Sequence, residues 1–172
     1  MIQSFKDRTP TISEKAFVAE SAQVIGNVTI GESIVLFNAV IRGDRGTITI
    51  GNDTSIQDNA VIHADPQFSA DIGDNVTVGH AAVLHGCKIN SNTLIGMNST
   101  VLNGAEIGSF SIVGAGAVVT QSLKIPERSL VLGVPGKVVR DVTDEELNLI
   151  ERSAEIYIEL RDKYIFIESK VV

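Results

Sequence analysis

Aliphatic residues recur at every sixth position along most of this chain. The series runs from Ile12 to Leu36, from Ile50 to Leu84 with one longer unit inside it, and from Ile89 to Ile125. A small or β-branched residue usually stands four places after each of these aliphatic residues. Because an α-helix repeats every 3.6 residues or so, it cannot produce this spacing, and the pattern predicts a repeat of short strands and corners.

Each six-residue unit is predicted to form one short strand and one corner. Three units then make a triangular coil of about 18 residues, whose strands stack about 4.8 Å apart in parallel ladders with the aliphatic residue pointing inward. The next position is often Gly or Asn, which suits a corner that needs unusual backbone angles. Examples are Gly31, Gly51, Gly73, Gly79, Asn90 and Gly96. The pattern therefore predicts an all-β parallel β-helix.

The repeat stops after Ile125, and a different organisation is expected beyond it. The segment IPERSLVLGVPGKVVRDV contains two prolines and two glycines, which predicts a linker that returns along the coil. A C-terminal α-helix follows in residues 142–172, because Thr143 and Glu146 form a capping box. Its apolar stripe consists of Leu147, Ile150, Ala154, Tyr157 and Tyr164. We expect one domain, with coil and linker in residues 1–141 and the helix packed on the coil, where Tyr157 or Tyr164 can approach a site.

Composition and charge narrow the class of protein and its partners. The chain has 172 residues with 44% hydrophobic and 20% charged side chains, which is typical of one globular domain. A net charge of −7 argues against nucleic acid and against an anionic membrane surface as partners. No signal-peptide pattern or membrane-spanning stretch is found, so a cytoplasmic location is expected. The single cysteine, Cys87, has no partner for an internal disulfide and is interpreted as structural.

All three histidines of the chain fall between positions 63 and 85. Three neutral imidazoles with one open position make a common catalytic zinc site. His63 comes one place after Ile62, and His85 comes one place after Leu84, three units later. These two histidines should therefore stack one coil apart, where their rings can converge on one ion at about 2.0 Å from each nitrogen.

His80 belongs to the unit that starts at Val78 and so to a different face of the triangle. Within one chain it should not reach the other two histidines. Three prisms around a threefold axis could supply it from a neighbouring subunit, which predicts a homotrimer with metal at the subunit interfaces. Imidazole ligands accept Zn²⁺, Fe²⁺ or Co²⁺, so the spacing does not select the metal. The alternative is that the three histidines are only exposed corner residues.

Further polar residues fall on the same columns as the histidines. Arg42 and Asp44 lie one coil before His63, and Gln57 lies one coil before Gly79 on the column of His80. Polar groups on both sides of an ion are what the surroundings of a metal site require. Two other interpretations stay open: Arg42 with Asp44 could form only a subunit salt bridge, and Gln57 could be a surface amide.

Four segments carry a family resemblance that spans nearly the whole chain: AVIRGD at 39–44, SIQDNAVIH at 55–63, GHAAVLHG at 79–86 and LVLGVPGKVVR at 130–140. They resemble the gamma-class carbonic anhydrase family, whose bacterial and archaeal relatives are often labelled acetyltransferases or ferripyochelin-binding proteins. The resemblance, and not the spacing, implies a left-handed coil. It also implies that His63 and His85, with His80 of a neighbouring subunit, bind zinc or a similar ion. Arg42 and Asp44 would order the interface, and Gln57 would contact the metal's water or bicarbonate.

The activity implied is hydration of CO2 to bicarbonate by a metal hydroxide, since a zinc-type ion lowers the pKa of bound water toward about 7. Well-studied members carry acidic residues that move protons out of the site. Here Arg45 follows Asp44, and the loop ADPQFSAD after His63 contains no Glu, so slow turnover is expected. Two rivals remain: an acyltransferase that uses coenzyme A with a histidine as base, and a metal-binding scaffold without catalysis.

Overall fold

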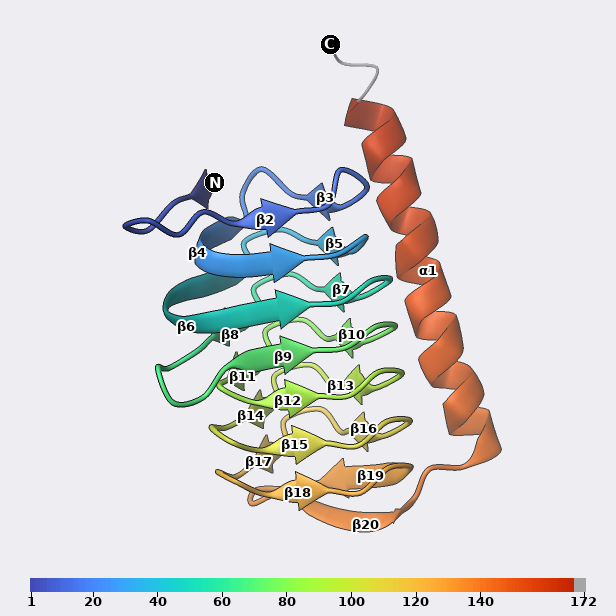
Figure 1. Cartoon of the computed structure of the whole chain (residues 1–172). Helices are drawn as coiled ribbons and strands as arrows, with labels where there is room; N and C mark the ends of the chain where they lie inside the picture. Colours follow the sequence, from blue (N-terminus) through green and yellow to red (C-terminus); the bar gives the residue numbers. More distant parts are fainter. Residues whose placement is uncertain (169–172) are drawn as a thin grey trace.

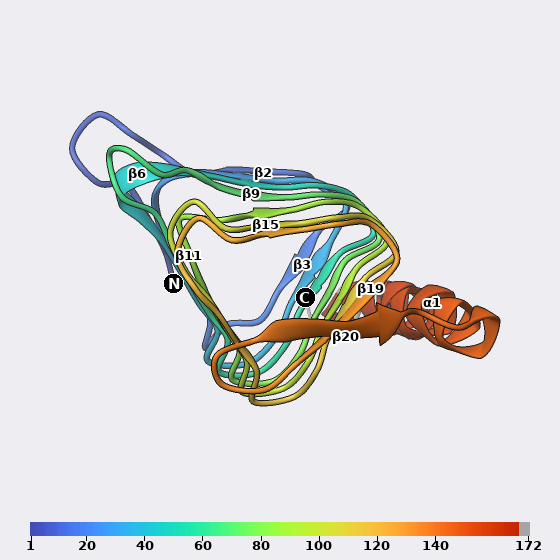
Figure 2. The same ribbon diagram turned by 90° about the horizontal axis from the view of Figure 1, so that it is seen from below.

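Short parallel strands wind into a β-solenoid of about seven turns, with one helix along its side (Figure 1). This computed structural model describes residues 1–168. Viewed along its axis, the coil has a triangular outline (Figure 2). No helix within the described part of the chain is long and apolar enough to cross a membrane. The predicted parallel coil is confirmed, and its handedness stays an implication of the resemblance.

Three ladders of strands form the sides of the triangle. The first face contains β8 (Val61–His63), β11 (Val83–His85), β14 (Thr100–Val101) and β17 (Val118–Val119). The second contains β9 (Ala70–Ile72), β12 (Lys88–Ile89), β15 (Glu106–Ile107) and β18 (Lys124–Ile125). The third contains β3 (Phe17–Val18), β5 (Ile34–Val35), β7 (Ser55–Ile56), β10 (Thr77–Val78), β13 (Leu94–Ile95), β16 (Ile112–Val113), β19 (Ser129–Leu132) and β20 (Lys137–Asp141).

Two long strands at the start of the coil bend around the corner between the first and second faces. They are β4 (Gln23–Ile30) and β6 (Val40–Ile50), and β6 pairs with both β8 and β9. The short strands β1 (Ile2–Gln3) and β2 (Thr11–Ile12) pair with β4. Because β6 turns this corner, its first part belongs to the first face and its last part to the second face. The candidate site lies at the same corner.

The sixth-position aliphatic residues fill the axis of the coil, as the spacing predicts. Ile62, Leu84 and Val101 are successive register partners on the first face, and Ile41, outside the sixth-position series, continues their column; each of the four is 0% exposed. Cys87 is also buried and makes no disulfide. Burial raises the pKa of its thiol to about 12, so the thiol stays protonated and the structural interpretation of Cys87 holds.

The reason for the corner glycines differs from the one expected. Gly79 and Gly96 do not adopt positive φ; a Cβ added to Gly79 would lie 2.8 Å from the carbonyl oxygen of Ile95 in the next coil. The left-handed conformation occurs two residues later, at Ala81 (φ 57°) and Asn98 (φ 57°). Glycine is therefore required because neighbouring coils stack too closely for a side chain, and the unusual backbone angles fall on other residues.

The segment expected to be a return linker instead contains two strands. β19 pairs in parallel with β16 and so continues the third face of the coil. β20 then pairs antiparallel with β19 at the end of the coil before the chain enters the helix (Figure 1). The two prolines and two glycines that suggested a linker are accommodated in the turns around these strands.

The helix α1 (Asp144–Glu168) begins at the predicted capping box. Glu146 N donates to Thr143 Oγ1 at 3.3 Å, and Thr143 N donates to Glu146 Oε2 at 2.9 Å. The helix runs back along the third face, against β3, β5, β7 and β10 (Figure 1). The expected range 142–172 therefore starts two residues early, and its last four residues lie outside the described part of the chain.

Ile150 and Leu149 are neighbours on α1 that face opposite environments, and they allow a direct test of helix packing. Ile150 is 2% exposed in a cluster with Ile112 and Leu130, whereas Leu149 is 53% exposed. We expect Ile150→Ala to lower the free energy of unfolding by about 2–5 kcal/mol, because it leaves a cavity. Leu149→Ala should change it by less than about 0.5 kcal/mol. Urea denaturation of both variants measures the difference, and equal effects would contradict the packing.

Candidate metal centre

His63 and His85 face each other at the corner between the first and second faces. They are register partners on β8 and β11, because Ile62 and Leu84 before them are paired in the core. Nδ1 of His63 lies 3.0 Å from Nε2 of His85, and the ring centroids are 5.0 Å apart. The structure thus stacks these two histidines one coil apart, as the repeat count predicts.

Arg42 and Asp44, on β6, hold the other side of His63. Arg42 is the register partner of His63, and its Nη1 donates to Asp44 Oδ2 at 2.6 Å. Asp44 Oδ1 lies 3.1 Å from Nε2 of His63. Burial alone would raise the pKa of Asp44, but the hydrogen bonds from Arg42 and His63 outweigh it and lower that pKa. A charged Asp44 accepts a hydrogen bond from the Nε2–H of His63, which leaves Nδ1 to face His85 as an electron-pair donor.

The donor atoms at this corner fit a divalent transition-metal ion. His63, His85 and Asp65 each offer one ligand atom, and these three atoms lie within 4.8 Å of one another. Two nitrogens that both bind a tetrahedral ion at about 2.0 Å stand about 3.3 Å apart, close to the observed 3.0 Å between the imidazoles. Two imidazoles and a carboxylate suit Zn²⁺, Fe²⁺ and related ions. Whether these residues ligate a metal stays a prediction.

His80 and Gln57 lie at a different corner, as the face count predicts. His80 follows β10, and its Nδ1 is 2.7 Å from Asp58 Oδ2. It does not belong to the cluster of possible ligands that the described residues form. Gln57 is 5% exposed and, with His80 and Tyr157, lines a hollow of about 250 Å³ against α1. One chain therefore carries two halves of the expected site on separate corners.

The two tyrosines of α1 have different surroundings. Tyr157 lies at the hollow beside His80. Burial, and to a smaller extent the nearby charge of Asp58, raises the pKa of the Tyr157 hydroxyl. Tyr164 stacks on Phe17 with ring centroids 4.6 Å apart, in the core packing near the start of the coil. Only Tyr157 is thus placed next to a residue of the expected site.

Three residues of these corners were missed in the sequence. Asp65 lies in the loop between β8 and β9, where extra residues break the six-residue count. Asp58 pairs with His80. The Oδ1 atom of Asn103 lies 2.6 Å from Nδ1 of His85. Counting one coil beyond His85 reaches Leu102, so Asn103 lies one residue past the position that the repeat marks. The loop does lack glutamate, as noted, yet Asp65 brings a carboxylate to the histidines.

Comparison with known proteins gives consistent matches. The family model "Bacterial transferase hexapeptide (six repeats)" matches residues 86–121. A "Probable carbonic anhydrase" of Methanocaldococcus jannaschii is 55% identical over 152 residues, covering 88% of this chain and 96% of that protein. A "Carbonic anhydrase" of Geobacillus kaustophilus is 43% identical over 165 residues, covering 95% and 91%. A crystal structure of a Bacillus cereus "putative acetyltransferase" superposes with a TM-score of 0.93 at 41% identity, covering 95% of both chains.

Proposed function

The chain belongs to the hexapeptide-repeat gamma carbonic anhydrase family, and from this premise we propose that it is a metal-dependent lyase that hydrates CO2 to bicarbonate. The observation that carries the proposal is the corner where His63 Nδ1 meets His85 Nε2 at 3.0 Å with the Asp65 carboxylate in reach. When bound there, a zinc-type ion supplies activated water at neutral pH for attack on CO2.

The residues of the chain have separable roles in this proposal. His63 and His85 hold the ion, and Asp44 orients His63 through the hydrogen bond to its Nε2. Arg42 keeps Asp44 charged and in place through its Nη1. Gln57, from a neighbouring subunit, orients the bicarbonate product, since an amide can both donate and accept hydrogen bonds.

A homotrimer completes the site in this proposal, because His80 is at another corner of the same chain. The mass in light scattering should be near three times 18.3 kDa. His80→Ala should weaken metal binding while leaving His63 and His85 in place. A monomer that binds metal as tightly as the wild-type preparation would contradict the shared site.

Acyl transfer is the second candidate, favoured by the names of the matching family model and of the Bacillus cereus structure. Metal content and turnover discriminate between the candidates, including a scaffold that binds metal without catalysis. Protein purified without a histidine tag is analysed for metal by mass spectrometry and assayed for CO2 hydration by stopped flow. Metal near one ion per chain with hydration supports the lyase, whereas metal without turnover supports the scaffold. A metal-free protein that acetylates amines from acetyl coenzyme A would overturn the proposal.

A further inference from the structure

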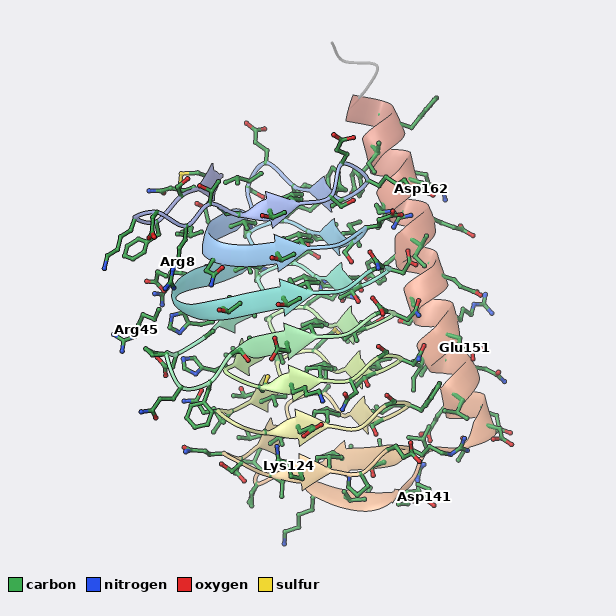
Figure 3. The ribbon with its side chains drawn as sticks, viewed as in Figure 1. Arg8, Arg45, Lys124, Asp141, Glu151 and Asp162 are labelled. Carbon is green, nitrogen blue, oxygen red and sulfur yellow. The ribbon has the colours of Figure 1, made fainter. Side chains whose placement is uncertain are left out.

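Four polar side chains, those of Arg45, Asp65, Asn103 and His85, contact one another in turn. The series ends at Nδ1 of His85, the nitrogen that faces away from His63. His85 Nδ1 lies 2.6 Å from Oδ1 of Asn103, which is on the next coil, one residue past the position that corresponds to His85. Asn103 Nδ2 donates to Asp65 Oδ2 at 3.4 Å. Asp65 Oδ1 in turn pairs with Arg45 Nε at 3.4 Å. Arg45 lies on the side of the coil remote from α1, as Figure 3 shows.

The chemistry of these groups determines which atom donates and which accepts in each hydrogen bond of the series. A carboxylate only accepts, so Asp65 accepts the hydrogen bond from Asn103, while Arg45 forms an ion pair with its other oxygen. This turns the amide of Asn103 with Nδ2 toward Asp65 and with Oδ1 toward His85. Because an amide oxygen only accepts, His85 Nδ1 must carry its proton. A neutral imidazole has one N–H, so Nε2 of His85 keeps its electron pair and faces the electron pair of His63 Nδ1 at 3.0 Å, a repulsive contact that a cation held by both nitrogens would relieve.

We propose that Asn103 is a positioning residue that, oriented by Asp65 and Arg45, fixes His85 in the Nδ1–H tautomer whose Nε2 is ready to bind a metal ion. The benefit for metal binding rests on the proposed function, whereas the tautomer is a property of the protein without metal. The arrangement also gives Arg45, which stands where an acidic residue was expected, a role in holding Asp65.

The fold leaves space for this arrangement at Gly86. This glycine has φ +55°, and a Cβ on it would lie 2.4 Å from Asn103 Oδ1 and 2.7 Å from Cβ of Phe68. Phe68 belongs to the loop that carries Asp65, and the two residues exchange backbone hydrogen bonds at 3.1 Å. Any side chain at position 86 would displace either the amide or the loop. The close packing therefore holds Asn103 and Asp65 against His85.

The experiment compares two substitutions of similar size at Asn103. Asn103→Leu removes both polar atoms, whereas Asn103→Asp keeps an acceptor for His85 and loses the donor to Asp65. Asn90→Leu is the matched control, because Asn90 is also partly buried and donates through Nδ2, to the carbonyl oxygen of Ile107 on another face. The first readout is the ¹⁵N NMR tautomer of His85 in metal-free protein at alkaline pH, where imidazoles are neutral. The second is the Kd for Zn²⁺, measured by chelator competition.

In the wild-type protein and in Asn103→Asp, His85 should be the Nδ1–H tautomer. Asn103→Leu should give a mixture of tautomers and raise the Kd for Zn²⁺ about 10–100-fold, as loss of an outer hydrogen-bond partner does in other metal sites. Asn90→Leu should leave both readouts unchanged. An Nε2–H tautomer in the wild type would overturn the proposal, as would a Kd in Asn103→Asp raised as much as in Asn103→Leu. A wild-type protein that has the Nδ1–H tautomer but binds no metal would instead remove the proposed function and retain the positioning of His85.

Discussion

Replacing His85 with alanine is expected to abolish metal binding and any CO2 hydration. The substitution removes the imidazole whose Nε2 lies 3.0 Å from His63 Nδ1, and an ion in an open site is held far more weakly by two imidazoles than by three. The Kd for Zn²⁺ should rise by more than about 100-fold, beyond the range typical of outer hydrogen-bond partners. Metal analysis of the purified variant and chelator competition measure the loss.

Leu102→Ala is the matched control for this experiment. Leu102 occupies the position of His85 one coil later, since Val101 before it is the register partner of Leu84. Truncation there removes a side chain of comparable size from the same column without removing a metal ligand. Metal content should stay at the wild-type level in Leu102→Ala. A His85→Ala protein that is folded and keeps its metal would show that the ion binds elsewhere, and would contradict the proposed centre.

The repeat spacing was sufficient to predict the coil and the stacking of His63 on His85. Six-residue periodicity fixes which residues share a column, because inward aliphatic residues such as Ile62 and Leu84 must pair in the core. The same count separated His80 from the other two histidines. The capping box at Thr143 located the start of α1 within two residues, since its two reciprocal hydrogen bonds are local in sequence.

The features that the spacing missed depend on contacts outside the repeat. Asp65 lies in a loop with extra residues, so its column cannot be counted, and its position depends on the packing of Phe68 over Gly86. β20 pairs antiparallel with β19 and follows no six-residue period, so a segment rich in Pro and Gly resembled a linker. Glycine at position 79 was explained by unusual backbone angles, but the short distance to the next coil is what excludes a side chain there.

Slow CO2 hydration that small buffers accelerate is the second large effect that we expect. Each turnover releases a proton, which a group at the site must accept and pass to solvent. Both carboxylates near His63 and His85 are already engaged, since Asp44 accepts from Arg42 and His63. Asp65 is held by Arg45 and Asn103. Added imidazole should therefore raise kcat in a saturable way and leave kcat/KM for CO2 nearly unchanged, because buffer acts after CO2 has reacted.

Stopped-flow rates over a range of imidazole concentrations test this expectation, at constant pH and ionic strength. Because imidazole can also ligate a metal ion, the series is repeated with HEPES, which binds metals poorly; acceleration by both buffers identifies proton transfer as the limiting step. A wild-type rate that is already fast and does not respond to either buffer would mean that a residue of the chain moves the proton. The hydroxyl of Tyr157 beside His80 and the Asp58 carboxylate are the groups to replace in that case. Absence of turnover at every buffer concentration, in protein that retains its metal, would favour the scaffold, since a missing proton carrier slows catalysis without removing it.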